Sequence, residues 1–239
     1  MRILGVRMDC LDMAGAVRAI ERMVEEGRET RLVATVNPEF VMRARVDPRF
    51  GAVLESADLC LADGIGVVWA MRRQGCTQYE RVPGSDLVPV LAERCASRGW
   101  RPFLLGARPG VAVAAARCLE AEYPGLRVAG THSGSPRPED DADALRRIDD
   151  ARPDVLLVAY GAPDQEFWIA RNRARLHVPV AIGVGGTFDF LAGRVRRAPA
   201  WMRRAHLEWL WRLVRQPARV RRMAVLPLYA LAVLRGPAH

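Results

Sequence analysis

The sequence contains no lysine: its 36 positively charged side chains, histidines aside, are all arginines. Every cation is therefore a guanidinium group, which can bind a phosphate through two parallel hydrogen bonds, although a coding bias would equally explain the missing lysine. The arginines are unevenly distributed. Residues 194–239 hold 11 of them against the single acid Glu208, a net charge of +10, whereas residues 1–193 have a net charge of −1. We therefore expect a nearly neutral body followed by a basic appendage.

Long hydrophobic runs are also missing. The longest, residues 223–234, has 12 residues and contains Pro227, whereas a bilayer-spanning helix needs roughly 20 apolar residues. Near the N-terminus, Asp9 and Asp12 interrupt any hydrophobic stretch, which argues against a secretory signal. We expect a cytoplasmic protein whose appendage is peripheral on the inner face of the cell membrane, because arginine, tryptophan and aliphatic side chains together suit an anionic surface. The tryptophans of this segment are Trp201, Trp209 and Trp211.

Cysteine is infrequent and shows no pairing pattern. The five cysteines are odd in number, and none belongs to a C-x-x-C pair. Most of them fall within apolar stretches that favour a helix or a strand, so we expect reduced thiols in the core of a cytoplasmic protein. They are Cys10, Cys60, Cys76, Cys95 and Cys118.

Two ligand motifs are incomplete. A dinucleotide fingerprint needs G-x-G-x-x-G after a strand, but one candidate turn offers only Gly106 and Gly110, and the glycines at 183–186 precede the bulky residues 187–189. These turns favour phosphate or nucleotide binding over NAD. The Asp-x-Asp pattern at 141–143 opens a helical stretch instead of ending a strand, so its carboxylates should complement the helix dipole. We expect no metal and no other cofactor.

Short apolar runs alternate with amphipathic stretches along most of the chain. Six runs favour strands, at residues 31–36, 57–62, 101–106, 126–131, 154–160 and 178–184. Five stretches are long enough for crossover helices, at residues 13–26, 85–97, 110–122, 138–150 and 163–176. This alternation predicts an α/β fold with a Rossmann-like, mostly parallel sheet between flanking helices. We expect an α/β catalytic domain over residues 1–194 and a basic helical appendage over residues 195–239.

Polar residues gather at the strand-to-helix turns, where parallel sheets bind their ligands. Thr35 and Asn37 follow the first strand, and Pro38 makes Asn37 a natural helix cap. Asp63 follows the second strand and precedes a helical stretch at 65–73. The local pattern favours an N-cap role for Asp63; the alternative is a carboxylate that accepts a proton from an attacking hydroxyl. Together these residues would bring a hydroxyl, an amide and a carboxylate to neighbouring loop ends, a set that can bind a sugar.

Two more candidates lie in other turns. Arg81 is in a loop before a predicted helix, a position where an arginine is usually solvated. Gln165 lies in the first turn of another predicted helix, directly after the turn at Tyr160 and Gly161, where a ligand held by backbone amides would meet it. The ordinary interpretation of Gln165, a first-turn helix residue, stands beside that one.

The order of these motifs resembles a known family. Five separated segments carry the resemblance: Thr-Val-Asn-Pro-Glu-Phe (35–40), Ala-Asp-Gly-Ile-Gly-Val (62–67), Arg-Val-Pro-Gly-Ser-Asp (81–86), Gly-Ala-Pro-Asp-Gln-Glu (161–166) and Gly-Val-Gly-Gly-Thr-Phe-Asp-Phe (183–190). Arg-Arg-Ala-Pro (196–199) and the tail rich in tryptophan and arginine follow them. In this order and spacing, the chain resembles the bacterial TagA/WecG/CpsF glycosyltransferase family over essentially its whole length.

The resemblance implies an inverting, metal-independent glycosyltransferase. Such an enzyme moves N-acetylmannosamine or a related hexose from a UDP-sugar to a sugar carried on undecaprenyl diphosphate, for teichoic acid or another cell-surface polysaccharide. Its partners would be the UDP-sugar donor, the polyprenyl-diphosphate-linked acceptor and an anionic membrane surface, but no nucleic acid; a homo-oligomer is compatible with the family. Departing UDP develops negative charge, which arginines can stabilise in place of a metal ion.

The resemblance also implies roles for individual residues. Asp63 becomes the expected catalytic base. The expected substrate-binding residues are Thr35, Asn37, Arg81 and Gln165, together with Arg212, Arg219 and Arg222 of the appendage at the diphosphate. The nucleotide is expected at Gly185, Gly186 and Asp189. Beside these, the turns at Gly106, Tyr160 and Gly161 are expected to contribute nucleotide contacts.

Two other classes of protein stay open. A non-catalytic nucleotide-binding, membrane-tethering module would need only the basic appendage, with the polar loop ends as helix caps, but it would leave the five ordered motifs unexplained. A nucleic-acid binder would show strongly salt-dependent affinity for RNA or DNA. Binding to liposomes and to an oligonucleotide would separate these two classes.

Overall fold

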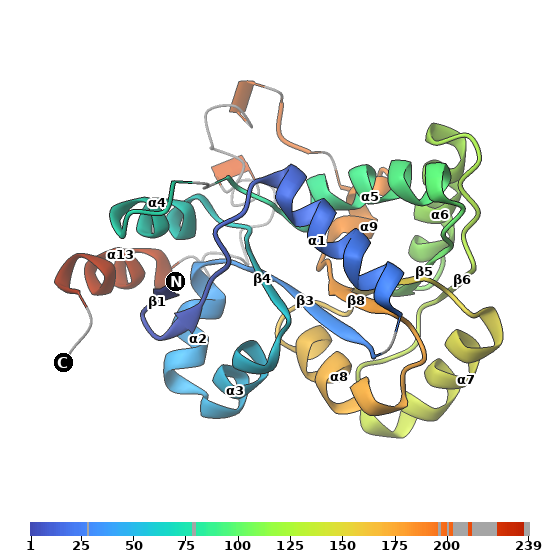
Figure 1. Ribbon diagram of the computed structural model, residues 1–239, viewed down its shortest axis with the longest axis horizontal. Coiled ribbons are helices and arrows are strands. Elements are labelled where there is room, and N and C mark those ends of the chain that lie inside the picture. Colours follow the sequence, from blue (N-terminus) through green and yellow to red (C-terminus); the bar gives the residue numbers. More distant parts are fainter. Residues whose placement is uncertain are drawn as a thin grey trace.

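A six-stranded parallel sheet forms the centre of the protein (Figure 1). The computed structural model describes residues 1–27, 29–77, 80–195, 197–199, 201–202, 210–211 and 224–236. The strand order is β4-β3-β8-β7-β5-β6, and each neighbouring pair is parallel. The strands are β3 (Arg31–Val36), β4 (Leu59–Ala62), β5 (Pro102–Gly106), β6 (Gly130–His132), β7 (Val155–Ala159) and β8 (Val180–Gly183). The prediction of a Rossmann-like α/β fold is confirmed.

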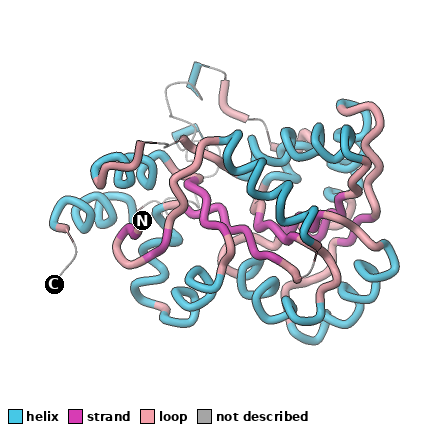
Figure 2. The backbone as a smooth tube through the Cα atoms, viewed as in Figure 1, coloured by secondary structure: helices cyan, strands magenta, loops and turns pink. Residues whose placement is uncertain are grey.

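Helices cover both faces of this sheet, as the tube in Figure 2 also shows. One face carries α1 (Met13–Glu26), α5 (Gly84–Arg98), α6 (Val111–Glu122) and the short α9 (Thr187–Leu191). The other face carries α2 (Pro38–Val46), α3 (Pro48–Ser56), α7 (Asp141–Ala151) and α8 (Asp164–Asn172). Beyond the β4 edge lie α4 (Ile65–Arg73) and α13 (Val225–Arg235). The sheet is therefore buried on both sides.

Strand β3 shows how the two layers share one sheet. Leu32, Ala34 and Val36 belong to the core cluster on the α3 and α8 side, whereas Val33 belongs to the cluster on the α1 and α5 side. All four are fully buried. A strand covered on both faces can be apolar at nearly every position, and this is why the strands stood out in the sequence as continuous apolar runs.

Element boundaries agree with the sequence in most places and differ in a few. Helix α1 has the predicted bounds, because Asp12 caps its start and Gly27 ends it in the left-handed conformation. The strand expected at 126–131 is wrong in extent: β6 has only three residues, since it is an edge strand that pairs with β5 alone. The expected helix at 138–150 is divided into a 3₁₀ turn (Pro138–Asp140) and α7.

Three more differences concern short elements. The helix expected at 163–176 ends as α8, and a 3₁₀ turn (Arg173–Arg175) replaces its last residues. The sequence did not reveal the antiparallel hairpin of β1 (Arg2–Ile3) and β2 (Val6–Arg7), nor helix α3. Strands of two residues carry no periodicity, which explains why the hairpin was missed.

The cysteines are free thiols. Cys60, Cys76 and Cys95 are buried as expected, and burial raises the pKa of both Cys60 and Cys95 to about 12, which keeps them protonated and unreactive. Cys118 differs, because it lies exposed on α6.

Part of the predicted appendage packs on the body. Helix α13 contacts α2 and α4, and its Tyr229 is only 2% exposed. Among the described residues, no helix combines the length and the apolar character needed to span a bilayer. Arg212, Arg219 and Arg222 lie outside the described residues.

Candidate active site

A cavity of about 650 Å³ lies at the carboxyl edge of the sheet. Its walls come from the segments that follow β3, β4, β7 and β8, which are the four adjacent strands at one end of the sheet. The loop before α5 and the helix α13 complete the walls. The cavity therefore occupies the edge where doubly covered parallel sheets bind their ligands.

The fold brings most of the predicted site residues into this one cavity. Those that line it are Thr35, Asn37, Asp63, Arg81, Tyr160, Gly161, Gln165, Gly185, Gly186 and Asp189. Gly106 does not line it; it ends β5, which lies beyond β7 in the sheet. Its nucleotide role stays a prediction without support from the cavity, and the predicted appendage arginines are outside the described residues.

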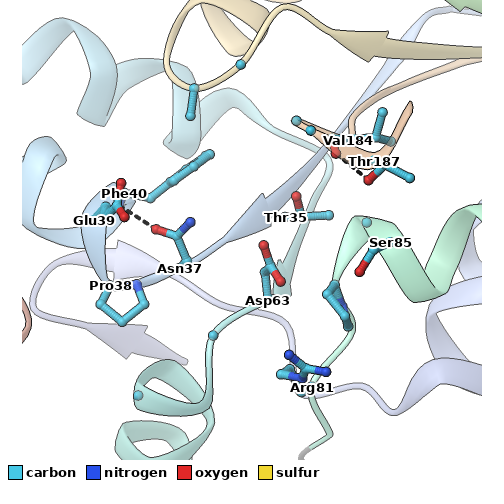
Figure 3. Close-up of a pocket in the computed structure, with 18 of the residues that line it drawn as sticks. Thr35, Asn37, Pro38, Glu39, Phe40, Asp63, Arg81, Ser85, Val184 and Thr187 are labelled. Atoms are coloured by element: carbon cyan, nitrogen blue, oxygen red, sulfur yellow. Dashed lines mark hydrogen bonds between the residues drawn. The ribbon is translucent and has the colours of Figure 1, made fainter. Parts of the chain in front are cut away.

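Asp63 lies in the middle of the polar side chains shown in Figure 3, between Asn37, Thr35 and Arg81. The N-cap residue of α4 is Gly64, which has no side chain with which to cap the helix. The local prediction that Asp63 caps this helix is therefore wrong, and the side chain lines the cavity instead. The β4 turn packs closely against the β3 turn, because a Cβ atom at Gly64 would lie 2.7 Å from Pro38 Cδ.

Thr35 and Asn37 both make bonds within the protein. The Asn37 side chain caps α2 by accepting a 3.1 Å hydrogen bond from the Phe40 backbone N–H, as predicted. The Thr35 hydroxyl, which is 5% exposed, donates a 3.0 Å bond to the Gly183 carbonyl at the end of β8. These bonds fix the β3 turn against the neighbouring strand, with both side chains at the cavity wall.

Arg81 is not a solvated loop arginine. Its side chain is 19% exposed, and its guanidinium lies 3.5 Å from the Asp86 carboxylate in the first turn of α5. Arg197 donates to the other Asp86 oxygen at 2.6 Å. Two guanidinium groups therefore share one carboxylate, and of the three residues Arg81 lines the cavity. The sequence did not predict this arrangement because Arg197 is more than 100 residues away from Asp86.

Gln165 connects two turns of the cavity. Its Oε1 accepts hydrogen bonds from the backbone N–H of Gly161 at 3.2 Å and of Gly185 at 3.0 Å. Its Nε2 donates a 2.7 Å bond to Glu166 Oε1. Since Gln165 is 2% exposed, much of its hydrogen-bonding capacity is used inside the protein, where it connects the two backbone turns beside the cavity.

Burial shifts two ionisable groups beside the cavity. It raises the pKa of the fully buried Glu166 to about 8, although the bond from Gln165 acts in the opposite direction. It also raises the pKa of the Tyr160 hydroxyl well above its ordinary value, with the charge of Asp141 adding to the effect. Both groups are therefore protonated at neutral pH. Glu166 ends the motif at 161–166, but the sequence assigned it no role, because nothing in its local pattern reveals burial.

Helix α13 supplies an apolar wall. Leu226, Tyr229 and Ala230 line the cavity, and the Tyr229 hydroxyl donates a 3.3 Å bond to the Gly66 carbonyl in α4. The sequence suggested a membrane surface for this apolar run, while the family resemblance implied that the appendage as a whole docks over the active site. Apolar residues lie on both sides of this helix, a pattern that could have indicated that one side packs on the body.

The Asp-x-Asp carboxylates are engaged by arginines. Asp141 pairs with Arg171 at 2.7 Å, and Asp143 pairs with Arg146 at 2.6 Å and Arg147 at 2.8 Å. Burial alone would raise the pKa of Asp141, but the bonds from Arg171 and its neighbours hold it below the ordinary value. In the described part of the chain, no three His, Cys, Asp or Glu side chains come together as metal ligands.

Known proteins match this chain along nearly its whole length. The model of the glycosyl transferase WecG/TagA/CpsF family matches residues 1–238. An enzyme named N-acetylglucosaminyldiphosphoundecaprenol N-acetyl-beta-D-mannosaminyltransferase from Bacillus spizizenii is 36% identical over 224 residues, covering 94% of this chain and 86% of the relative. Proteins of the same name from Bacillus subtilis and Staphylococcus aureus (strain MRSA252) are 38% and 30% identical, covering 85% and 98% of this chain and 79% and 92% of the relatives.

The matched range includes the turns of β3, β4, β7 and β8 that surround the cavity, and also α13. The resemblance inferred from the motifs is confirmed over body and C-terminal segment alike. The chain therefore belongs to the WecG/TagA/CpsF family of glycosyltransferases.

Proposed function

We propose that this glycosyltransferase moves N-acetylmannosamine from UDP to N-acetylglucosamine carried on undecaprenyl diphosphate, in the synthesis of teichoic acid or a related cell-surface polymer. The names of the relatives support the transferred sugar and the acceptor. The structural observation that supports the proposal most is the Asp63 carboxylate, which lines the cavity among a hydroxyl, an amide and a guanidinium group.

In the proposed reaction, Asp63 takes the proton of the acceptor hydroxyl as that oxygen attacks the anomeric carbon of the donor sugar. The bond between the anomeric carbon and the UDP oxygen breaks on the opposite face, which inverts the configuration. Thr35 and Asn37 flank Asp63 and would orient the sugars. One displacement needs one base, whereas a retaining double displacement would also need a nucleophile close to the anomeric carbon.

Negative charge develops on the departing diphosphate, and the proposal assigns its stabilisation to arginine and backbone N–H groups. Arg81 lines the cavity with its guanidinium anchored by Asp86. The turn at Gly185 and Gly186 precedes α9 and lines the same cavity. Arg212, Arg219 and Arg222 are proposed to add further positive charge, with Asp189 at the nucleotide, in a reaction that needs no metal ion.

The lipid part of the acceptor is proposed to reach the cavity along α13. This helix turns Leu226, Tyr229 and Ala230 to the cavity, while Leu228, Leu231 and Leu234 are 58%, 44% and 57% exposed on its other side. With the basic residues around it, this exposed face would lie on the anionic inner surface of the cytoplasmic membrane. A helix between cavity and lipid would keep the carrier close to Asp63.

UDP release tests the proposal. The purified protein is assayed in EDTA with a panel of UDP-sugars, each with and without a synthetic N-acetylglucosaminyl diphosphate lipid. We expect release that depends on the acceptor, with UDP-N-acetylmannosamine as the preferred donor. Metal dependence would remove the arginine mechanism, and release from a different donor would change the sugar. UDP binding without release from any donor would favour the non-catalytic nucleotide-binding module.

A further inference from the structure

Glu166 has no part in the reaction described above, yet it is fully buried directly behind the cavity. We propose that Glu166 is a positioning residue: its carboxyl group selects the orientation of the Gln165 amide that ties the Gly161 turn to the Gly185 turn. The structural half of this inference stands by itself, and only its effect on catalysis rests on the proposed function.

The polarity of the Gln165 amide explains the need for Glu166. The amide oxygen faces two backbone N–H groups, those of Gly161 and Gly185, so its NH₂ must face an acceptor. Glu166 Oε1 is that acceptor, at 2.7 Å. If the amide were flipped, its NH₂ would face both N–H donors and its oxygen would face Glu166. Together, the two N–H donors and the Glu166 acceptor therefore fix which way the amide points.

The pair fits tightly against the end of β8. A Cβ atom at Gly183 would lie 2.5 Å from Glu166 Oε1 and 2.6 Å from Gln165 Nε2, closer than real Cβ contacts come. The Gly183 carbonyl in turn accepts the Thr35 hydroxyl bond. One connected set of contacts thus runs from β3 through β8 to the β7 turn, and it spans the floor of the cavity.

The surroundings of Glu166 favour its neutral form. Its Oε2 is buried and has no hydrogen-bond partner among the described residues, so an ionised carboxylate would be uncompensated. The negative charge of Asp164 on the same helix adds to the effect of burial and disfavours ionisation further. A neutral Glu166 adds no negative charge behind the turns where the proposed anionic donor would bind.

Amide hydrogen exchange at a fixed pH of about 7 tests the positioning directly, without any substrate. In Glu166→Met, which removes the acceptor, the Gly161 and Gly185 amides should exchange roughly tenfold faster, as they should in Gln165→Met. In Glu166→Gln, which keeps an acceptor, they should exchange as in the wild type. The Val184 amide is the internal control, because it donates to the Val158 carbonyl at 2.9 Å and not to Gln165. Unchanged exchange in both Met variants overturns the proposal.

The pH dependence of stability gives a second test, which works even if the Met variants do not fold. The folded protein keeps a proton on Glu166 up to a pKa of about 8, whereas the unfolded chain loses it near 4.5. Between these values the native state binds more protons, so stability falls as pH rises, by at most about tenfold in the folding equilibrium per pH unit. Glu166→Gln has no proton to lose at this position. The Tm of this variant minus the Tm of the wild type should therefore increase from pH 5 to pH 8 and then stay constant.

The effect of Glu166 on catalysis, the catalytic half of the proposal, is tested by measuring kcat/KM as a function of pH, with acceptor-dependent UDP release as the assay. The wild type should lose activity above about pH 8 as Glu166 ionises, and Glu166→Gln should lack that loss. The same alkaline loss in both proteins overturns the catalytic half, while the exchange result decides the positioning half. Absence of any transfer would instead count against the proposed function.

Discussion

Arg197 donates a 2.6 Å hydrogen bond to the carboxylate of Asp86. Asp86 lies in the first turn of α5, whereas Arg197 belongs to the segment that leads into the basic C-terminal region. The second Asp86 oxygen faces Arg81 at 3.5 Å. One carboxylate therefore links a cavity arginine to the start of the C-terminal segment.

Replacing Asp86 with asparagine should loosen both arginines. We expect kcat/KM to fall about tenfold, because Arg81 loses its fixed position, and the free energy of unfolding to fall by about 1 kcal/mol, since the ion pairs are partly solvent-screened. Steady-state kinetics and urea unfolding measure the two effects. Asp150→Asn is the control, because Asp150 is 72% exposed and makes a solvent-exposed ion pair with Arg146 at 3.6 Å. An equal loss in that variant would contradict a specific role for Asp86.

Replacing Asp63 with asparagine should abolish proton transfer but not nucleotide binding. We expect kcat to fall by about 10³, with UDP affinity, measured by calorimetry, within about threefold of the wild type. Glu39 and Asp189 are the other carboxylates that line the cavity. Glu39→Gln and Asp189→Asn should lower kcat far less than Asp63→Asn does. If Glu39→Gln has the larger effect, Glu39 is the base instead.

Gly183 and Gly186 allow a matched test of packing at the end of β8. Gly183→Ala should lower the free energy of unfolding by about 1–3 kcal/mol, because its new methyl group would meet the Glu166 and Gln165 side chains at 2.5–2.6 Å. Gly186→Ala meets nothing within 4 Å, so its change should stay within about 0.5 kcal/mol. Chemical unfolding of both variants decides the comparison, and equal stability would show that the Glu166 pocket adapts.

The exposed leucines of α13 should determine affinity for membranes. Replacing Leu228, Leu231 and Leu234 with glutamine should weaken binding to anionic liposomes at least about tenfold, because their apolar area is lost from the interface. Circular dichroism should show an unchanged fold, since none of the three is buried. Val46→Gln combined with Val113→Gln removes exposed apolar groups elsewhere, and it should not change liposome binding.

The elements that the sequence predicted best are those determined by local pattern. The strands that became β3, β5, β7 and β8 are buried on both faces and appear as apolar runs, and α1 carries its own start and stop residues, Asp12 and Gly27. The capping position predicted for Asp63 is one residue off, since the N-cap of α4 is Gly64. The approach of Gly64 to Pro38 and the burial of Tyr229 on Gly66 depend on tertiary packing, which no local pattern encodes.

In the candidate site, too, the sequence predicted what local motifs determine and missed what tertiary contacts determine. Ten predicted residues line one cavity because the motifs follow strands whose ends share an edge of the sheet. Glu166 and Arg197 belong to motifs that the sequence analysis quoted, but neither was given a role, because each acts through a partner that only the tertiary structure brings close.

Helix α13 follows every strand of the sheet in the chain, yet it forms part of the cavity wall. During synthesis, the sheet and its strand-end turns can therefore emerge from the ribosome before the cavity is closed. A nonsense mutation between residues 184 and 224 would keep all six strands in the chain but remove the α13 wall, which would leave that side of the cavity open to water. The cavity wall of this enzyme is thus complete only once α13, the last of its described elements, has been translated.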